Sequence, residues 1–170
     1  MDGYSYTWKV IATHDPFTIV TGGETDRDSW GQDDPAVLGR ELQLRGLLEF
    51  IKNENIKNVV SITADVHFAA AIKADPERAK FKNFNPFWEF VIGPINSGAF
   101  GPGNLDPSFG PEYDFVRAPV TLDLPANIPP SRTDLQFFGL AEVDGRTAEF
   151  TAQIRDITGD LVYEKVLIPE

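Results

Sequence analysis

Short apolar runs separated by segments rich in Gly, Pro and Asp dominate the pattern along this chain. β-branched and other apolar residues fill residues 7–13 (TWKVIAT) and 56–64 (IKNVVSITA), and both runs have the length of a strand. The second run is almost entirely apolar, which is typical of a strand that is covered on both faces of a sheet. Further short strands are predicted at 17–20 (FTIV) and 88–94 (WEFVIGP).

One amphipathic helix is predicted between the first strands and residues 56–64. Asp34 followed by Pro35 suits a helix start, because the Asp side chain can accept from free backbone N–H groups and proline has no N–H to leave unpaired. The helix is expected to end near Asn53. Its apolar stripe, expected to face the core, consists of Leu44, Leu47, Leu48 and Ile51. The charged positions expected mostly to face water are Arg40, Glu41, Arg45 and Glu49.

The second half of the chain differs in composition and in its pattern of apolar residues. Residues 93–130 are rich in Gly, Pro and Asn, and a long irregular loop region over a site is expected there. Three strand-like runs follow at 135–143, 148–157 and 161–168, joined by hairpin turn sequences, so an antiparallel β-meander is predicted. Together with the βαβ-like unit of the first half, this predicts one α/β domain over residues 1–170.

Composition and charge narrow the classes of function. The chain is 42% apolar with a formal net charge of −11, which fits a globular domain and disfavours binding to a nucleic-acid backbone. No run has the length of a transmembrane segment, and the absence of cysteine excludes disulfides and thiolate metal sites. A phosphate-binding site in so acidic a chain would need cations to cancel the local field.

Several motifs of catalysis and ligand binding are missing. The chain has neither the GxSxG elbow of serine hydrolases nor a Walker or Rossmann glycine motif. The glycine-rich segment at 88–103 could offer backbone N–H groups to an anion or act as a packing or lid loop. The aromatic residues nearby are expected to anchor core and loops rather than to form a stacking platform; they are Phe81, Phe84, Phe87, Trp88 and Phe90.

The two histidines of the chain both follow predicted strands. In open α/β sheets the carboxyl ends of the strands form the ligand-binding edge. Asp65 and His67 lie two residues apart, so an extended backbone would point both to the same side, where carboxylate and imidazole could bind a divalent or trivalent cation. His14 and Asp15 could come from the neighbouring parallel strand. The loop between supplies further acids, namely Asp26, Asp28, Asp33 and Asp34.

Each of these residues also has a purely structural interpretation. Asp65 could cap a helix, because the sequence FAAAIKA at 68–74 has good helix propensity. His14, before Asp15 and Pro16, could be a turn residue with its ring in solvent. Asp28 could be one solvated charge in an acidic loop.

Five segments, in this order, resemble the C-terminal half of the PhoD-like alkaline phosphatase/phosphodiesterase family, within the calcineurin-like metallophosphatase superfamily. They are TWKVIA, DSWG, LLEFIKNENIKNVVSITADVHFAA, NPFWEFVIGP and LQFFGLAEVDG. The resemblance covers about residues 8–168. It implies part of an αββα sandwich with a multi-metal site at strand ends, and metal-dependent hydrolysis of phosphate mono- or diesters.

The same resemblance implies roles for individual residues. The family's strand-end motif is Gly-Asp-Val-His, in which Ala64 here replaces the glycine. Asp65 and His67 match its acid and histidine and are expected to be metal ligands, which favours this role over the helix cap. Asp28 matches an acid that is a calcium ligand in the family, and His14 is expected to be a ligand or to protonate the leaving alkoxide. Calcium and iron are the metals implied.

The resemblance also implies a missing part. The N-terminal half of such a domain supplies a metal-bridging aspartate, an asparagine and further ligands, and nothing before Trp8 matches them. We therefore expect the chain to be the C-terminal portion of a larger domain, with uncovered sheet edges that favour self-association. The alternative to an enzyme is a catalytically inert or associating structural domain. Kinship implies an extracytoplasmic location.

Overall fold

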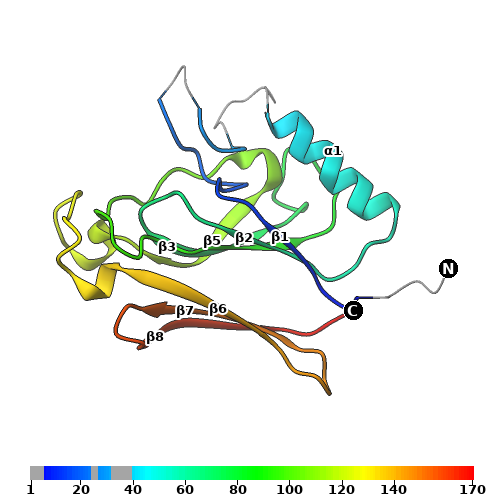
Figure 1. The fold of residues 1–170 in the computed structure, drawn as a ribbon. Helices are drawn as coiled ribbons and strands as arrows, with labels where there is room; N and C mark the ends of the chain where they lie inside the picture. Colours follow the sequence, from blue (N-terminus) through cyan, green and yellow to red (C-terminus); the bar gives the residue numbers. More distant parts are fainter. Residues whose placement is uncertain (1–5, 24–26, 32–39) are drawn as a thin grey trace.

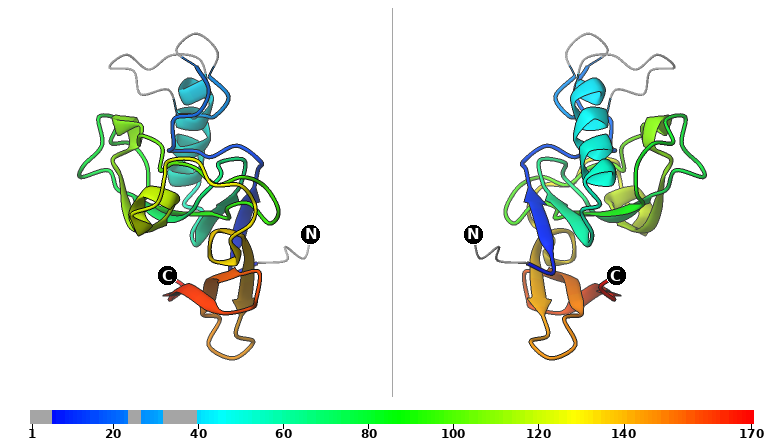
Figure 2. Two further views of the ribbon diagram at one scale, coloured as in Figure 1. Left: turned by 90° about the vertical axis from the view of Figure 1, so that its left-hand side faces the viewer. Right: turned by 90° about the vertical axis from the view of Figure 1, so that its right-hand side faces the viewer.

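The structure, a computed structural model, describes residues 6–23, 27–31 and 40–170. Two β-sheets stack face to face, and a helix packs on the outer face of the larger sheet (Figures 1 and 2). The larger sheet contains β1 (Lys9–Ala12), β2 (Val59–Thr63), β3 (Ala69–Ala74), β4 (Phe87–Val91) and β5 (Pro111–Arg117). The smaller sheet contains β6 (Phe137–Val143), β7 (Phe150–Asp156) and β8 (Leu161–Leu167). The helix is α1 (Arg40–Asn53), and short 3₁₀ helices occupy Pro107–Phe109, Pro119–Leu122 and Thr133–Leu135.

The larger sheet is mixed, with strand order β1-β2-β4-β3-β5. β1, β2 and β4 run parallel, with Val10 beside Val60 and Val60 beside Trp88. β3 is antiparallel to both of its neighbours, β4 and β5. Because β1 and β2 are parallel neighbours joined through α1, the predicted βαβ-like unit is confirmed.

Helix α1 covers the larger sheet with the apolar stripe that its sequence predicts. Leu44, Leu48 and Ile51 are buried, and Leu44 and Leu48 belong to an aromatic-rich cluster that includes Phe17 and Phe87. Leu47 is half-buried. The expectation for one charged position was wrong, since Glu41 is only 1% exposed. The predicted start at Asp34 and Pro35 lies outside the described residues.

Residues 68–74, which have good helix propensity, form strand β3 instead of a helix. This strand lies between β4 and β5, and both of its faces are covered. Its fully buried residues are Ala69, Ala70, Ala71, Ile72 and Ala74. Small side chains that favour a helix in isolation are also those that fit a strand between two layers, and tertiary packing decides between the two states. The helix-cap interpretation of Asp65 is therefore wrong.

Two other expectations need correction. Residues 17–20 form no continuous strand; Ile19 and Val20 make isolated bridges to Leu105 and Gly31. The segment 93–130 is not irregular throughout, because it contains β5, which pairs with β3 along its length. A register shift between Ala71 and Ile72 interrupts that pairing, and β5 carries a proline at its first position. These features weaken the strand pattern in the sequence.

The predicted C-terminal meander is confirmed. β7 pairs antiparallel with β6 on one side and β8 on the other, and the turns fall where the sequence places them. Phe150, Ala152 and Ile154 of β7 are buried against the larger sheet. Within the described residues the layers are thus helix, sheet and sheet, and no helix covers the outer face of the meander (Figure 1).

Strands β1 and β6 are edge strands of their sheets. Val10 on β1 and Val143 on β6 are each about half exposed, at 47% and 52%. An edge strand with exposed apolar side chains can pair with a further strand. In the part of the chain that the structure describes, no helix has the length and apolar character needed to cross a bilayer.

We expect Asp156 to stabilise the β7–β8 turn in a pH-dependent way. Its Oδ1 accepts hydrogen bonds from the Thr158 hydroxyl at 2.6 Å and from the backbone N–H groups of Thr158 and Asp160 at 2.9 and 3.1 Å. The Thr158 hydroxyl, followed by these amides, lowers the pKa of the Asp156 carboxyl below its ordinary value. The stabilisation is therefore fully present above about pH 4, the range of an unfolded Asp, and is lost as the pH falls through the folded pKa.

The measurement is the free energy of unfolding by urea as a function of pH. Asp156→Ala should lose about 1 kcal/mol at pH 7, with a smaller difference from the parent below about pH 4. Asp156→Asn, which still accepts hydrogen bonds but does not titrate, is the matched control for the pH dependence. A difference between parent and Asp156→Ala that is constant from pH 7 to pH 3 would contradict this account.

Candidate functional site

Asp65 and His67 lie in the turn that leads from β2 to β3. Asp65 has a left-handed backbone, with φ of 64°, which Asp tolerates better than most residues. The backbone is therefore not extended between Asp65 and His67, contrary to the simple expectation from the sequence. Both residues nevertheless line the same cavity, together with the buried Val66 and Phe68.

The ring of His67 is held in a defined orientation. Its Nδ1 lies 2.5 Å from the carbonyl oxygen of Gly98 and 3.4 Å from the hydroxyl of Ser97. The ring also stacks on Phe100, with centroids 4.4 Å apart and planes 20° apart. A carbonyl oxygen can only accept, so Nδ1 carries the proton and donates it, which leaves Nε2 with a free lone pair. A metal-binding histidine commonly has this arrangement.

The loop that holds His67 depends on close backbone approach to Phe68. Gly101 has a φ of +103°, and a Cβ there would collide with the Phe68 ring. At Gly93 a Cβ would lie 2.7 Å from the carbonyl carbon of Phe68, closer than real Cβ contacts come. The backbone N–H of Phe100 donates to the carbonyl oxygen of His67 at 3.1 Å. Glycine at these positions therefore lets the loop lie against the turn and bring Gly98 and Phe100 to His67.

Gln136, just before β6, fixes the same loop from the smaller sheet. Its side-chain oxygen accepts from the N–H of Ser97 at 3.0 Å, and its amide nitrogen donates to the Ser97 carbonyl oxygen at 2.9 Å. Gln136 is 1% exposed, so these bonds are shielded from water. The position of the His67 ring thus depends on residues from both sheets.

Asp28 lies on a separate wall of the cavity. Its backbone N–H donates to the Thr21 carbonyl at 3.3 Å, and the neighbouring Ser29 hydroxyl lies 2.6 Å from the Ile19 carbonyl oxygen. The Arg40 guanidinium donates to the backbone carbonyls of Arg27 and Asp28. These bonds hold the backbone of the Asp28 segment, while the Asp28 side chain itself stays exposed.

The cavity between these walls measures about 410 Å³, and Asp28, Asp65 and His67 all line it. Its remaining lining comes from 19–22, Val66, Phe68 and 100–103. Two carboxylates and an imidazole with a free Nε2 form a donor set that suits a divalent or trivalent cation. Within the described residues, however, no three His, Cys, Asp or Glu side chains lie close enough to form a complete metal cluster. The three side chains are of the kinds that bind metal ions, but among the described residues they do not make up a complete site.

His14 lies outside this cavity. It follows β1 at the expected edge of the sheet, and its carbonyl oxygen accepts from the N–H of Ala64 at 3.1 Å. Its side chain is 84% exposed, and Nδ1 lies 3.0 Å from the carboxylate of Asp15, which in turn lies 3.8 Å from Arg40. The structure therefore brings together three of the four residues predicted from the sequence. Asp26, Asp33 and Asp34, the other acids of the loop, are outside the described residues.

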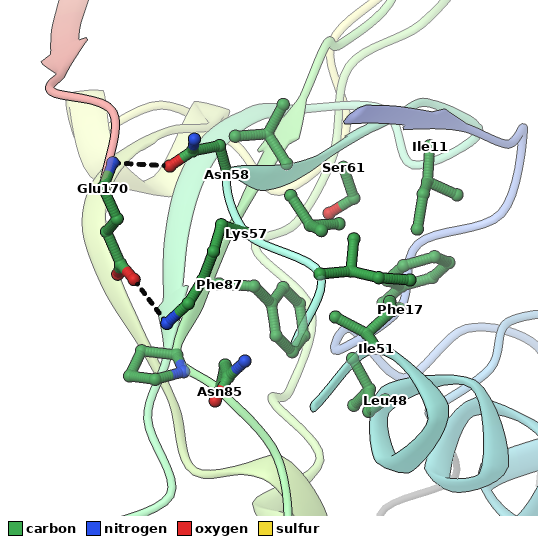
Figure 3. A pocket seen from close by; sticks show the side chains of 14 residues that line it. Ile11, Phe17, Leu48, Ile51, Lys57, Asn58, Ser61, Asn85, Phe87 and Glu170 are labelled. Carbon is green, nitrogen blue, oxygen red and sulfur yellow. Dashed lines mark hydrogen bonds and ion pairs between the residues drawn. The ribbon is translucent and has the colours of Figure 1, made fainter. Parts of the chain in front are cut away.

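A second hollow lies beside α1, away from these residues (Figure 3). It measures about 40 Å³ and is lined mainly by apolar side chains such as Ile11, Phe17 and Leu48. Lys57 and Glu170 close one side of it with an ion pair of 2.9 Å. It has no cluster of acids or histidines, and we assign it no chemistry.

The sequence reasoning missed the residues that orient the site. The ring of His67 is held by Gly98 and Phe100, and Gln136 holds the loop that carries them. The only signal in the sequence was the high density of glycine and aromatic residues at 93–103, which favours close packing of a loop against its neighbours. Glu89 was also missed, although a single acid inside the apolar run FWEFVI is a signal for a buried polar group with defined partners.

The orientation of His67 can be tested directly by NMR, because the chain has two histidines and therefore two ring systems. At alkaline pH, where imidazoles are neutral, we expect the long-range ¹H–¹⁵N pattern of His67 to be that of the Nδ1–H tautomer. His14, with its ring in solvent, is the internal reference, and His67→Asn identifies the signals. A predominant Nε2–H tautomer for His67 would contradict the assigned hydrogen bond to Gly98.

Comparison with known proteins bears on this site. The family model described as "PhoD-like phosphatase" matches residues 2–154 of the 170-residue chain. The matched region contains β1 through most of β7, and with them every residue of the cavity. No curated protein matches the chain closely enough to count as a relative. The chain belongs to the PhoD-like phosphatase family.

Proposed function

We propose that this protein hydrolyses phosphate mono- or diesters with the help of bound metal ions, and that Asp28, Asp65 and His67 supply part of the metal site. Membership of the family supports phosphoesterase activity. The observation that carries the proposal is the single cavity lined by two carboxylates and by a histidine whose Nε2 is free. By the same kinship we propose an extracytoplasmic location.

The charge of the chain supports the need for a cation. A phosphate ester brings negative charge into a cavity that already contains Asp28 and Asp65, in a chain of net charge −11. Without a positive charge between them, carboxylates and phosphate would repel one another. When bound, a divalent or trivalent ion supplies Lewis acidity toward the phosphoryl group and a more acidic water.

Residues on two walls of the cavity would bind the metal ions. Asp65 and His67 would hold one ion from the β2–β3 turn, and the bond from His67 Nδ1 to Gly98 keeps the ring turned so that Nε2 faces the ligand. Asp28 would bind calcium from the other wall. Phe100, which is 44% exposed and stacked on His67, would shield that ring from water on one face. For His14, whose ring lies in solvent next to Asp15, we propose protonation of the leaving alkoxide or metal binding.

We expect His67→Ala and Asp65→Asn to lose bound metal and activity together. The purified protein, not treated with chelator, should contain stoichiometric calcium or iron by mass spectrometry. Each variant should lose at least one equivalent and lower kcat/KM for phosphoester hydrolysis by orders of magnitude. Glu142→Gln, the same loss of charge at an exposed site on β6, is the matched control and should behave like the parent. Metal content and rate within a few-fold of the parent for His67→Ala would exclude this site.

His14 can be tested separately by varying the leaving group. An acid that protonates the leaving alkoxide matters most for a poor leaving group, so His14→Ala should slow hydrolysis of an alkyl phosphate about 100-fold or more. It should have little effect on p-nitrophenyl phosphate, and the metal content should stay that of the parent. Equal losses on both substrates together with loss of metal would instead make His14 a ligand, and no loss on either would remove it from the mechanism.

A second candidate function is a non-catalytic domain that associates through its sheet edges. Two observations favour it: the described residues form no complete metal cluster, and β1 and β6 are edge strands that expose Val10 and Val143. Light scattering after size-exclusion chromatography separates the two candidates. A dimer without stoichiometric metal or turnover would support the associating domain, whereas a metal-loaded protein with turnover supports the enzyme.

A further inference from the structure

Glu89 is a fully buried acid in the middle of β4. It is 0% exposed and lies between Trp88 and Phe90, whose rings stack on each other on the opposite face of the sheet. A carboxylate in such surroundings is costly unless donors surround it, and burial indeed raises the pKa of the Glu89 carboxyl. The mechanism proposed above makes no use of this residue, so its presence needs a reason.

The carboxylate of Glu89 accepts four hydrogen bonds from two separate segments. Oε1 accepts from the backbone N–H of Phe17 at 2.6 Å and from the hydroxyl of Thr63 at 3.1 Å. Oε2 accepts from the backbone N–H of Thr18 at 3.1 Å and from its hydroxyl at 2.5 Å. Every partner donates, so the group acts as a double acceptor that joins residues 17–18 to the end of β2.

These two segments lead directly into the two walls of the cavity. Thr63 is the last residue of β2, and Asp65 follows two positions later. From Thr18 the chain continues through Ile19 to Thr21, whose carbonyl oxygen accepts from the N–H of Asp28. Glu89 is thus a shared anchor for the wall that carries Asp28 and for the turn that carries Asp65 and His67.

We infer that Glu89 is a positioning residue, whose carboxylate sets the spacing between the Asp28 wall and the Asp65–His67 turn. The inference rests on the proposed function insofar as that spacing matters for binding a cation. Glu89 makes no hydrogen bond to Asp28, Asp65 or His67. It acts on them through Thr18 and Thr63.

Glu89→Gln is the decisive variant, because it keeps the shape but replaces one acceptor oxygen by an NH₂ group. That group would face two of the four donors, so the link between residues 17–18 and the end of β2 is broken. In the metal-free protein we expect amide shift changes in NMR spectra at Thr21 and Asp28 as well as at Asp65 and His67. Thr63→Val, which removes one donor, should change only the Asp65–His67 side. Phe150→Leu, buried under the opposite face of the sheet, controls for general loss of stability.

Calcium titration by calorimetry is the second readout. If the parent binds Ca²⁺, Glu89→Gln should raise the dissociation constant about tenfold or more, as for loss of other groups that orient metal ligands. Phe150→Leu should stay within about twofold of the parent.

The possible results distinguish the positioning role of Glu89 from the proposed metal-dependent function. Unchanged amide shifts on either wall in Glu89→Gln would overturn the positioning role, whether or not metal binds. Shift changes with unaltered Ca²⁺ affinity would also overturn it. A parent that binds neither calcium nor iron would count against the proposed function, while shift changes on both walls would still establish Glu89 as the anchor of their spacing.

Discussion

The close packing of the 93–103 loop against Phe68 is the constraint on which the candidate site depends. The loop can approach the ring only because Gly93 and Gly101 have no side chain at the points of contact. This approach brings the Gly98 carbonyl and the Phe100 ring to His67, and so determines which imidazole nitrogen is free. Phe68, the residue directly before β3, is itself buried in a cluster with Ile19 and Val91. Backbone packing thus controls the chemistry that the histidine can perform.

The sequence predicted those parts of the fold in which periodicity and turn residues agree. The apolar stripe of α1, the two parallel strands that flank it and the meander over β6–β8 were all recognisable. Expectations failed where packing between layers overrides local preference. Ala69–Ala74 has the composition of a helix and becomes a central strand, and β5 lacks a clear alternating pattern because a bulge and a proline interrupt it. Glu41 is buried although the next two residues of the helix, Leu42 and Gln43, are exposed.

For the site, the sequence identified donors but not the groups that orient them. Asp28, Asp65 and His67 were found from residue type, strand-end position and family resemblance, and the structure places all three around one cavity. His14 shared the strand-end position, yet its ring lies in solvent, because position at an edge does not determine side-chain direction. Gln136 is 39 residues from Ser97, and Glu89 is 71 residues from Thr18 and 26 from Thr63. No local sequence pattern reveals such contacts.

Trp8 joins the two sheets in a way that makes it a natural spectroscopic probe. Its indole N–H donates to the Ala148 carbonyl in the β6–β7 turn at 2.7 Å, and its ring lies 5.1 Å from that of Phe150. Trp30 packs instead on Phe17, whose backbone is fixed at the cavity side of the larger sheet. Of the chain's three indoles, these two therefore report on different events: separation of the meander from the larger sheet for Trp8, and rearrangement beside the cavity walls for Trp30. Trp→Phe replacements that leave either Trp8 or Trp30 as the sole tryptophan, with Trp88 also replaced, can distinguish opening of the sandwich from motion at the site.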